Sequence, residues 1–445
     1  MSNTELNKTL EKLSSISYCA KSNKRFEFMS LAHHLNEEFL KDCYYNLARN
    51  KAVGIDKVSW QEYETDLENN LITLVEKLKR KAFKPLPAKR VYIPKDNGEK
   101  RPLGISTIEN KIVESGITRI LQSIYEADFY DFSYGFRPKR NAHQALKVVG
   151  ESINFKPVNH IVEADIKGFF DNVDHDMLME FLKIRVKDRT LLLLIGKFLK
   201  AGYIDDNLLV KSEKGTPQGS ILSPMLANIF LHYVLDEWFD KTVKRYVNGY
   251  CEIVRYADDF ICLVQFPNEA QKILRALENR FNKYKLQLHP DKTRVFPFGR
   301  LEKQSAKTSN RKANTFDFLG FTHYCDKTRK GYFKVGRKTS AKKFRAKAKT
   351  LNLWLKKIRN QILTKGWWKI LALKLQGHYE YYGISENYHS IYTFYKLAIK
   401  LAKKWMNRRS QKKKMSWSKM TQYLLLYPLP KPSIRHNFYT SSHNV

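Results

Sequence analysis

The 445-residue sequence predicts an α+β fold, with antiparallel strands and helices in the first two thirds and helices in the last third. Short apolar runs flank the acidic pair Asp258 and Asp259, which is typical of a β-hairpin. Residues 95–101 contain an Asn-Gly pair, a signal of a second hairpin turn. From Ser340 onward, apolar residues instead recur every three or four positions, which is the period of an amphipathic helix.

The elements follow from the same periodicities, taken in order. Helices are predicted over the residues up to 50 and over 60–81, 174–200, 225–238 and 268–284, and in the last third over 340–362, 367–382 and 388–409. Strands are predicted at 90–94, 161–166, 253–264 (as a hairpin), 286–297 and 316–321. The polar, basic stretch 302–314 is predicted to be a linker, which divides the chain into domains 1–312 and 313–445.

The acidic pair is the first candidate site. An ionised carboxylate costs several kcal/mol to bury unless a cation or hydrogen-bond donors accompany it. Asp258 and Asp259 are therefore expected at the tip of a tight turn, either as ligands of Mg²⁺ or as an ordinary polar turn. Asp165 ends a strand-like run upstream, where it could face that turn across the rim of a sheet. Together the three carboxylates would complete a two-metal centre.

Two other stretches carry side chains that suit a nucleotide. Lys95 and Arg101 flank the predicted Asn-Gly turn, and cations on such a β-element could close over a triphosphate. The alternative is a surface hairpin that happens to be basic. The polar loop Gly215–Ser223, which contains Gln218, leads into the apolar helical run that begins at Met225.

The order of Asp165, the Gly215–Ser223 loop and the Asp-Asp hairpin resembles the palm of a reverse transcriptase, most closely that of group II intron-encoded proteins. Supporting stretches are found at 91–95, 101–105, 134–138, 141–143, 318–321 and 377–383. The last of these is similar to a signature of the family's maturase segment. The resemblance implies a right-hand polymerase with fingers and palm in 1–312, followed by an α-helical thumb and RNA-binding maturase region in 313–445. We expect the form of the family that lacks the C-terminal endonuclease domain.

The resemblance also implies a metal site. Asp165, Asp258 and Asp259 would be the catalytic residues and would hold two Mg²⁺ ions. The backbone oxygen of Ile166 would add a further ligand.

For the incoming dNTP, the resemblance implies contacts from Lys95, Arg101 and Gln218. Phe170, five residues after Asp165, would lie beneath the sugar, where a bulky ring would exclude a 2′-hydroxyl. The alternative for Phe170 is a plain core position, the commoner place for a phenylalanine.

The chain departs from the family's pattern after Leu103-Gly104-Ile105. The family usually has a proline, an Asp-Arg pair and a glutamine in the stretch that follows. This sequence has Ser106, Asn110, Lys111 and Glu114 there, so no role is carried over to those positions.

The charge distribution indicates a polyanionic partner. The formal net charge is +36, and from Leu301 onward Lys and Arg outnumber Asp and Glu by 33 to 5. This region is also rich in Trp and Tyr, unlike a disordered basic tail. Nucleic-acid binding is therefore favoured over a merely solvated surface. The bases in the first turns of the predicted helix after Ser340 are the candidate contacts: Lys342, Lys343, Arg345, Lys347 and Lys349.

The cysteines and the apolar runs indicate the compartment. Five cysteines without a Cys-x-x-Cys pair favour a reducing environment and indicate neither a disulfide framework nor a zinc ribbon. The polar N-terminus does not resemble a signal peptide. The apolar run near Leu191 is too short to span a bilayer. We expect a bacterial cytoplasmic protein that associates with the nucleoid or with ribonucleoprotein and not with a membrane.

Three functional hypotheses remain open. The first is a reverse transcriptase of a mobile group II intron that copies intron RNA with dNTPs on a DNA primer and assists splicing as a maturase. The second is a domesticated relative in phage defence or DNA repair. The third is an RNA-binding splicing factor with an inactive polymerase centre. The intact set of three carboxylates disfavours the third hypothesis, and the stretch Gly377–Gly383 favours the first over the second.

Overall fold

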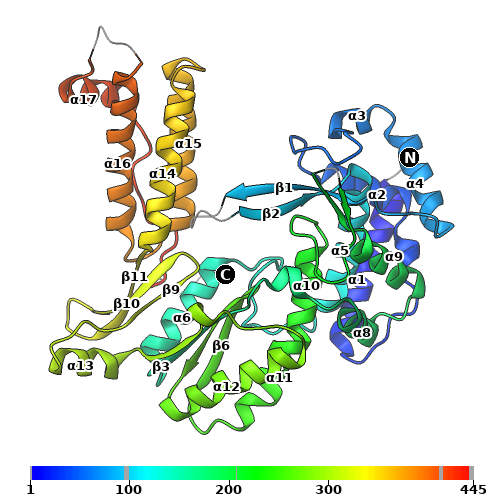
Figure 1. Cartoon of the computed structure of the whole chain (residues 1–445), viewed down its shortest axis with the longest axis horizontal. Helices are drawn as coiled ribbons and strands as arrows, with labels where there is room; N and C mark the ends of the chain where they lie inside the picture. Colours follow the sequence, from blue (N-terminus) through cyan, green and yellow to red (C-terminus); the bar gives the residue numbers. More distant parts are fainter. Residues whose placement is uncertain (1–2, 95–99, 207, 410–413, 440–445) are drawn as a thin grey trace. The chain divides into compact units, whose positions relative to one another are not determined.

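The computed structural model describes residues 3–94, 100–206, 208–409 and 414–439 (Figure 1). It has three sheets and many helices, so the predicted α+β class with a helical C-terminal part is confirmed. Contacts divide the chain into two compact units. The first comprises residues 1–145 and 160–295, and the second comprises 146–159 and 296–445. The assignment of 1–312 and 313–445 to separate functional domains remains a prediction.

The first unit begins with a group of helices that ends with α5. Their bounds are α1 (Asn3–Ser22), η1 (Ala32–His34), α2 (Glu37–Tyr45), α3 (Trp60–Glu64), α4 (Leu67–Lys79) and α5 (Ile108–Tyr125). Helices α1 and α2 both pack against α5. Ile112, Ile117 and Ile120 of α5 are fully buried, so this helix forms the centre of the N-terminal core.

Beside these helices lies a sheet with the strand order β2-β1-β4-β5. Its bounds are β1 (Ala88–Pro94), β2 (Lys100–Ile105), β4 (Tyr203–Asp205) and β5 (Leu208–Val210). Strands β1 and β2 pair antiparallel, with Pro94 opposite Lys100, so the predicted hairpin is confirmed. The turn itself, including Lys95, lies outside the described residues.

The central sheet has the order β6-β7-β3-β8. Its strands are β3 (His160–Asp165), β6 (Cys251–Tyr256), β7 (Asp259–Val264) and β8 (Arg294–Pro297). Residues 260–264 of β7 are all buried, and α12 (Pro267–Lys283) packs against β3 and β7 (Figure 1). The predicted hairpin and the predicted strand ending at Asp165 are therefore confirmed.

Two long predicted helices prove to be interrupted. Asp174 is the N-cap of α8, as predicted, but the helix ends at Arg185. Asp188 then caps α9 by accepting hydrogen bonds from the amides of Thr190 and Leu191. The predicted helix 225–238 contains a π-helical turn, η2. The bounds here are α7 (Phe169–Asn172), α8 (His175–Arg185), α9 (Arg189–Lys200), α10 (Ser223–Leu231), η2 (His232–Asp236), α11 (Glu237–Lys241) and η3 (Val243–Arg245).

The second unit contains the sheet β11-β10-β9 and the C-terminal helices. Its elements are β9 (Thr315–Phe318), β10 (Phe321–Lys327), β11 (Phe333–Thr339), α13 (Arg300–Thr308), α14 (Ala341–Ile358), α15 (Thr364–Tyr382), α16 (Tyr388–Asn407) and α17 (Trp417–Leu426), with most of α6 (Ala142–Phe155). Helix α16 packs against both α14 and α15.

The predicted linker 302–314 is wrong. Residues 302–308 belong to α13. The buried carboxylate of Glu302 pairs with Arg311 at 2.6 Å and accepts a hydrogen bond from the amide of Asn314. A polar composition alone could not reveal that one acid would anchor the segment.

Within the described ranges, none of the helices combines the length and apolar character needed to cross a membrane.

Candidate active site and nucleic-acid surface

Asp165 and Asp259 lie directly opposite each other on β3 and β7. The carbonyl of Asp165 accepts a hydrogen bond from the amide of His289 at 2.7 Å, on the side of β3 away from β7. The Asp165–Asp259 pair is therefore a non-hydrogen-bonded pair, in which the Cα atoms approach to about 4.5 Å and the side chains share one face. Two carboxylates from sequence positions 94 residues apart thus meet at one rim of the sheet.

Asp258 lies in the two-residue turn between β6 and β7, next to Ala257. Ala257 has a φ of +58°, a left-handed conformation that costs a non-glycine residue about 1–2 kcal/mol. Arg255 holds the turn in this conformation, because its Nη1 donates to the carbonyl of Ala257 at 2.9 Å. Its Nε donates to Asp236 at 2.7 Å, and both side chains are fully buried.

Sequence reasoning missed this support. Arg255 immediately precedes Tyr256 in the predicted hairpin, and a charge amid apolar residues was a usable signal. Its partner Asp236 was not predictable, because it comes from the π-helical turn η2.

The pKa values of Asp258 and Asp259 are both raised. The pKa of Asp259 is raised to about 7, first by desolvation and then by the neighbouring charges of Asp165 and Asp258. Desolvation and the charge of Asp165 also raise the pKa of Asp258. Asp259 keeps an exposed face, so repulsion between the acids acts together with a partial desolvation. Such a cluster favours a bound cation.

One cation of the protein already lies there. The ammonium of Lys292, at the end of η4 (Pro290–Lys292), pairs with Asp165 and lowers the pKa of Asp259. Lys292 was not assigned a role from sequence, because its partner lies 127 residues away. Among the residues that the structure describes, no group of three or more His, Cys, Asp or Glu side chains is close enough to hold a metal ion.

The donor set nevertheless fits a divalent cation. Carboxylate oxygens are hard ligands, as Mg²⁺ requires. A cation bound between them would also relieve their mutual repulsion. Ile166 lies opposite Leu288 in a bridge whose hydrogen bonds are made by Asp165 and Lys167. The carbonyl of Ile166 therefore points the other way, toward β7. This orientation supports its predicted use as a ligand.

Arg101 and Gln218 belong to segments that contact each other. Arg101 is exposed on β2 and lowers the pKa of Asp258 by its charge. The amide of Gly104, on the same strand, donates to the carbonyl of Gln218 at 2.6 Å. The approach requires glycine at Gly219, because a Cβ there would lie 2.5 Å from the carbonyl oxygen of Gly104. The structure thus joins the Gln218 loop to the strand that carries Arg101.

Phe170 lies at the other end of that loop. Its carbonyl accepts a hydrogen bond from the amide of Thr216 at 2.6 Å. The ring of Phe170 is half-buried and packs edge-to-face on Phe169, against the main core. The position is compatible with both predicted readings.

Three of the four positions that depart from the family's pattern make contacts that brace this region. Asn110 bonds to the backbone of Leu86. Glu114, fully buried, accepts hydrogen bonds from Ser106 at 3.2 Å and from the amide of Ile221 at 2.8 Å. Glu114 therefore connects the end of β2 to the end of the Gln218 loop.

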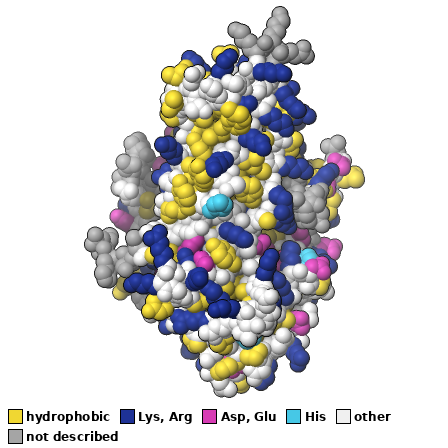
Figure 2. Space-filling model, turned by 90° about the vertical axis from the view of Figure 1, so that its left-hand side faces the viewer, with side chains coloured by type: hydrophobic (Ala, Val, Ile, Leu, Met, Phe, Trp, Pro, Cys, Tyr) yellow, Lys and Arg dark blue, Asp and Glu magenta, His cyan; other side chains and the backbone are white. Residues whose placement is uncertain are grey.

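The five predicted bases of α14 are all exposed, but they divide between two faces. Lys342, Arg345 and Lys349 follow an i, i+3, i+7 spacing and share one face of the helix. Lys347 lies over the ring of Tyr382 at 5.5 Å, on another face. In Figure 2 the helical part at the top shows Lys and Arg around apolar side chains, with few acids.

The stretch Gly377–Gly383 is largely a packing element of α15. His378, Tyr379 and Tyr382 are buried. The ring of His378 stacks on Phe394 of α16 at 4.0 Å, and Tyr381 donates to the carbonyl of Leu319 at 2.8 Å. These contacts join α15 to α16 and to the turn before β10.

Known proteins resemble this chain in the same regions. Residues 93–323 match the family "Reverse transcriptase (RNA-dependent DNA polymerase)". The chain is 42% identical over 191 residues to the group II intron-encoded protein LtrA of Lactococcus lactis, a match covering 43% of this chain and 32% of LtrA. It is 35% identical over 92 residues to the mitochondrial nuclear intron maturase 1 of Arabidopsis thaliana, covering 21% of this chain and 13% of that protein.

A further relative is matched over more of its length. Protein YkfC of Escherichia coli is 32% identical over 286 residues, covering 54% of this chain and 71% of YkfC. The chain thus spans about a third of LtrA but most of YkfC. The family match includes Asp165, Asp258 and Asp259, which the fold brings to one rim of the central sheet. On this match, which covers half of the sequence, the chain belongs to the reverse transcriptase family.

Proposed function

We propose that this chain is an RNA-directed DNA polymerase of the group II intron type, which extends a DNA primer with dNTPs on an RNA template. The observation that carries the proposal is the placement of Asp165 directly opposite Asp259, next to the Asp258 turn, in a member of the reverse transcriptase family. Arg255 fixes the turn, and a fixed arrangement suits chemistry that depends on position.

In this proposal, Asp165, Asp258, Asp259 and the Ile166 carbonyl would hold two Mg²⁺ ions. Bound there, the ions supply activation of the primer hydroxyl and charge stabilisation of the leaving group. Arg101 and Lys95 neutralise phosphate charge on the dNTP. Gln218 positions the nucleotide from a loop that is bonded to β2, and Phe170 limits the room for a 2′-hydroxyl.

The test is primer extension with poly(rA), oligo(dT), dTTP and Mg²⁺. The wild-type protein should make cDNA, and Asp258→Ala should reduce synthesis to background while template binding stays intact. Asp291→Ala is the matched control, because this carboxylate near Lys292 is 89% exposed. A wild-type protein that makes no cDNA with any divalent metal would reject the proposal.

We also propose a maturase role, in which the chain binds its intron RNA and assists splicing. The support is the likeness to relatives named as intron-encoded or intron maturase proteins, together with the exposed basic face of α14. A defence or repair role would instead be favoured if no flanking RNA were spliced in the protein's presence. A splicing factor without polymerase activity would be favoured if the protein promoted splicing but made no cDNA. The proposed setting is the bacterial cytoplasm, in association with ribonucleoprotein.

A further inference from the structure

Phe136 combines two features that are rarely found together in a bulky residue. Its backbone has a φ of +56°, and the residue is 49% exposed. A left-handed conformation is unusual for a large side chain and persists only when the surroundings enforce it. Burial of an apolar side chain does not supply the reason here, since the residue is about half exposed.

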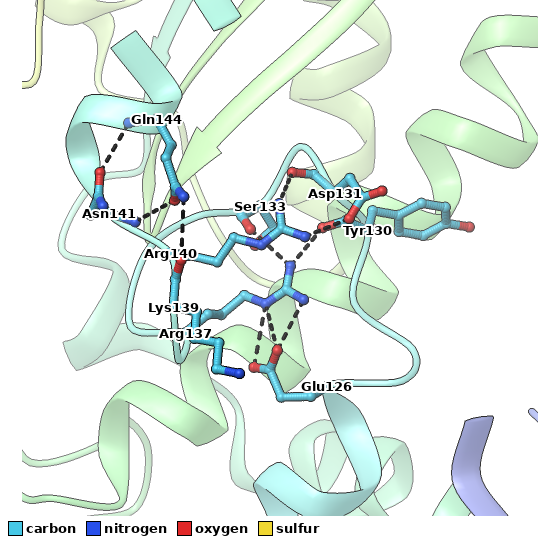
Figure 3. A network of polar contacts seen from close by, with 9 residues as sticks. All are labelled: Glu126, Tyr130, Asp131, Ser133, Arg137, Lys139, Arg140, Asn141 and Gln144. Atoms are coloured by element: carbon cyan, nitrogen blue, oxygen red, sulfur yellow. Dashed lines mark hydrogen bonds and ion pairs between the residues drawn. The ribbon is translucent and has the colours of Figure 1, made fainter. Parts of the chain in front are cut away.

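The surroundings do enforce the conformation (Figure 3). The buried guanidinium of Arg137 donates to the carbonyls of Tyr130 and Ser133 at 2.7 and 2.8 Å and pairs with Glu126 at 3.0 Å. The far end of the loop is fixed by a reciprocal cap at the start of α6, where Asn141 and Gln144 each accept from the other's amide at 3.0 Å.

The loop also abuts the carboxylate turn. The amide of Tyr134 donates to the carbonyl of Arg255 at 2.9 Å, so the loop runs beside β6. Gly135 approaches the turn so closely that a Cβ there would lie 2.3 Å from the nitrogen of Ala257. Phe136 follows directly, within one Cα–Cα step of about 3.8 Å. The backbone of Phe136 is therefore held at the edge of the Asp258 turn.

The chemistry of the exposed surface fits nucleic acid. Lys139 is also exposed, and it is likewise left-handed, with a φ of +61°. An exposed ring and an exposed ammonium in the same loop offer contacts to a base or sugar and to a phosphate. The candidate dNTP residue Phe170 lies in the segment after β3, and this segment is hydrogen-bonded to the Gln218 loop. The loop of Phe136 instead lies along β6, which is on the other side of β7 in the sheet.

From these observations we infer that Phe136 contacts the template–primer duplex at its reacting end and that its strained loop is built to hold the ring there. The inference rests on the proposed polymerase function and adds a nucleic-acid contact that is distinct from the dNTP set.

The test compares Phe136→Tyr, which keeps an aromatic ring, with Phe136→Asn, which removes it. Asparagine tolerates the left-handed backbone and removes the ring, so the melting temperature should be retained. Template–primer affinity, measured by fluorescence anisotropy, should fall about 5- to 100-fold in Phe136→Asn and stay near wild type in Phe136→Tyr. The KM for dNTP should be unchanged. Tyr246→Asn is the control, since this ring is 84% exposed near the opposite end of β6.

A second measurement does not depend on stability. Replacing Phe136 with the photo-crosslinker p-benzoylphenylalanine should give an adduct with labelled template or primer. The inference is overturned if Phe136→Asn binds as tightly as wild type, if only the KM for dNTP rises, or if the adduct is absent. These outcomes are interpreted only with a wild-type protein that makes cDNA in the same assay. Absence of cDNA from wild type would instead reject the proposed function.

Discussion

The acidic end of the central sheet and the basic face of α14 differ in how their charges are supported. The acids lie on a buried hairpin, and the bases lie on an exposed helix. Asp258 and Asp259 lie on a hairpin whose strands are buried and whose turn is held by Arg255. Lys342, Arg345 and Lys349 lie on an exposed helix face. The first arrangement fixes positions, as chemistry requires, and the second supplies attraction to a polyanion without fixing a geometry. In the proposed function, catalysis and RNA affinity would therefore depend on separate regions of the chain.

The sharpest way to break this comparison is to remove the acids. The double change Asp258→Ala and Asp259→Ala should lower cDNA synthesis by about 1,000-fold or more, because the proposed metal contacts would stabilise the transition state by several kcal/mol. RNA affinity and protein-assisted splicing of a cognate intron should remain. The assays are primer extension and spliced-exon yield from a precursor made from flanking DNA. Equal loss of both activities would contradict the separation.

The converse change acts on the helix. Reversing Lys342, Arg345 and Lys349 to Glu should lower the slope of log affinity against log salt by about 2–3, since each phosphate contact contributes ~0.7–0.9. Primer extension at saturating template should survive. The matched control reverses Lys327, Arg329 and Lys330, which are exposed near the β10–β11 turn. An equal change of slope in the control would assign the effect to net charge rather than to this face.

Within the acidic end, Phe170 distinguishes substrate fit from packing. Phe170→Val should raise ribonucleotide use relative to deoxynucleotide use by about tenfold or more, because a smaller side chain leaves room for a 2′-hydroxyl. The measurement is the ratio of kcat/KM for dNTP and rNTP in both proteins. An unaltered ratio with a lowered melting temperature would make Phe170 a core residue only.

The smallest expected effect concerns Glu114, which braces the Gln218 loop. Burial raises its pKa from 4.5 to about 7, and hydrogen bonds from Ile221, Ser220 and Ser106, followed by the charge of Lys111, partly oppose this rise. The folded state thus binds a proton that the unfolded state releases, so the contribution to stability is greatest below pH 4.5 and declines until about pH 7. Glu114→Gln removes this decline. Between pH 5 and 8, the free energy of unfolding of the variant should therefore rise by about 2 kcal/mol relative to that of the wild type.

Thermal unfolding across that pH range gives the comparison directly. Glu109→Gln is the control on the same helix, where the carboxylate pairs loosely with Lys77 at 3.8 Å. A constant difference between Glu114→Gln and wild type at every pH would contradict the assignment.

Local sequence patterns predicted the hairpins, the strand ending at Asp165 and the cap at Asp174, because these depend on neighbouring residues. Long-range partners were not predictable. Asp188 interrupts the predicted helix 174–200 and also accepts hydrogen bonds from the amides of Leu31 and Ala32, more than 150 positions away. The contact of Lys292 with Asp165 likewise depends on how the segment after α12 pairs with the end of β3.

That contact has a consequence for how metal would load. With the Lys292 ammonium on Asp165, the acidic cluster is partly neutralised before any ion arrives. Binding a divalent ion at Asp165 would then be an exchange of one cation for another rather than an addition. The apparent affinity would reflect the difference between two contacts, and the displaced lysine would become available to anionic groups of the substrate. Loading of metal and capture of phosphate would in this way be thermodynamically linked through a single side chain.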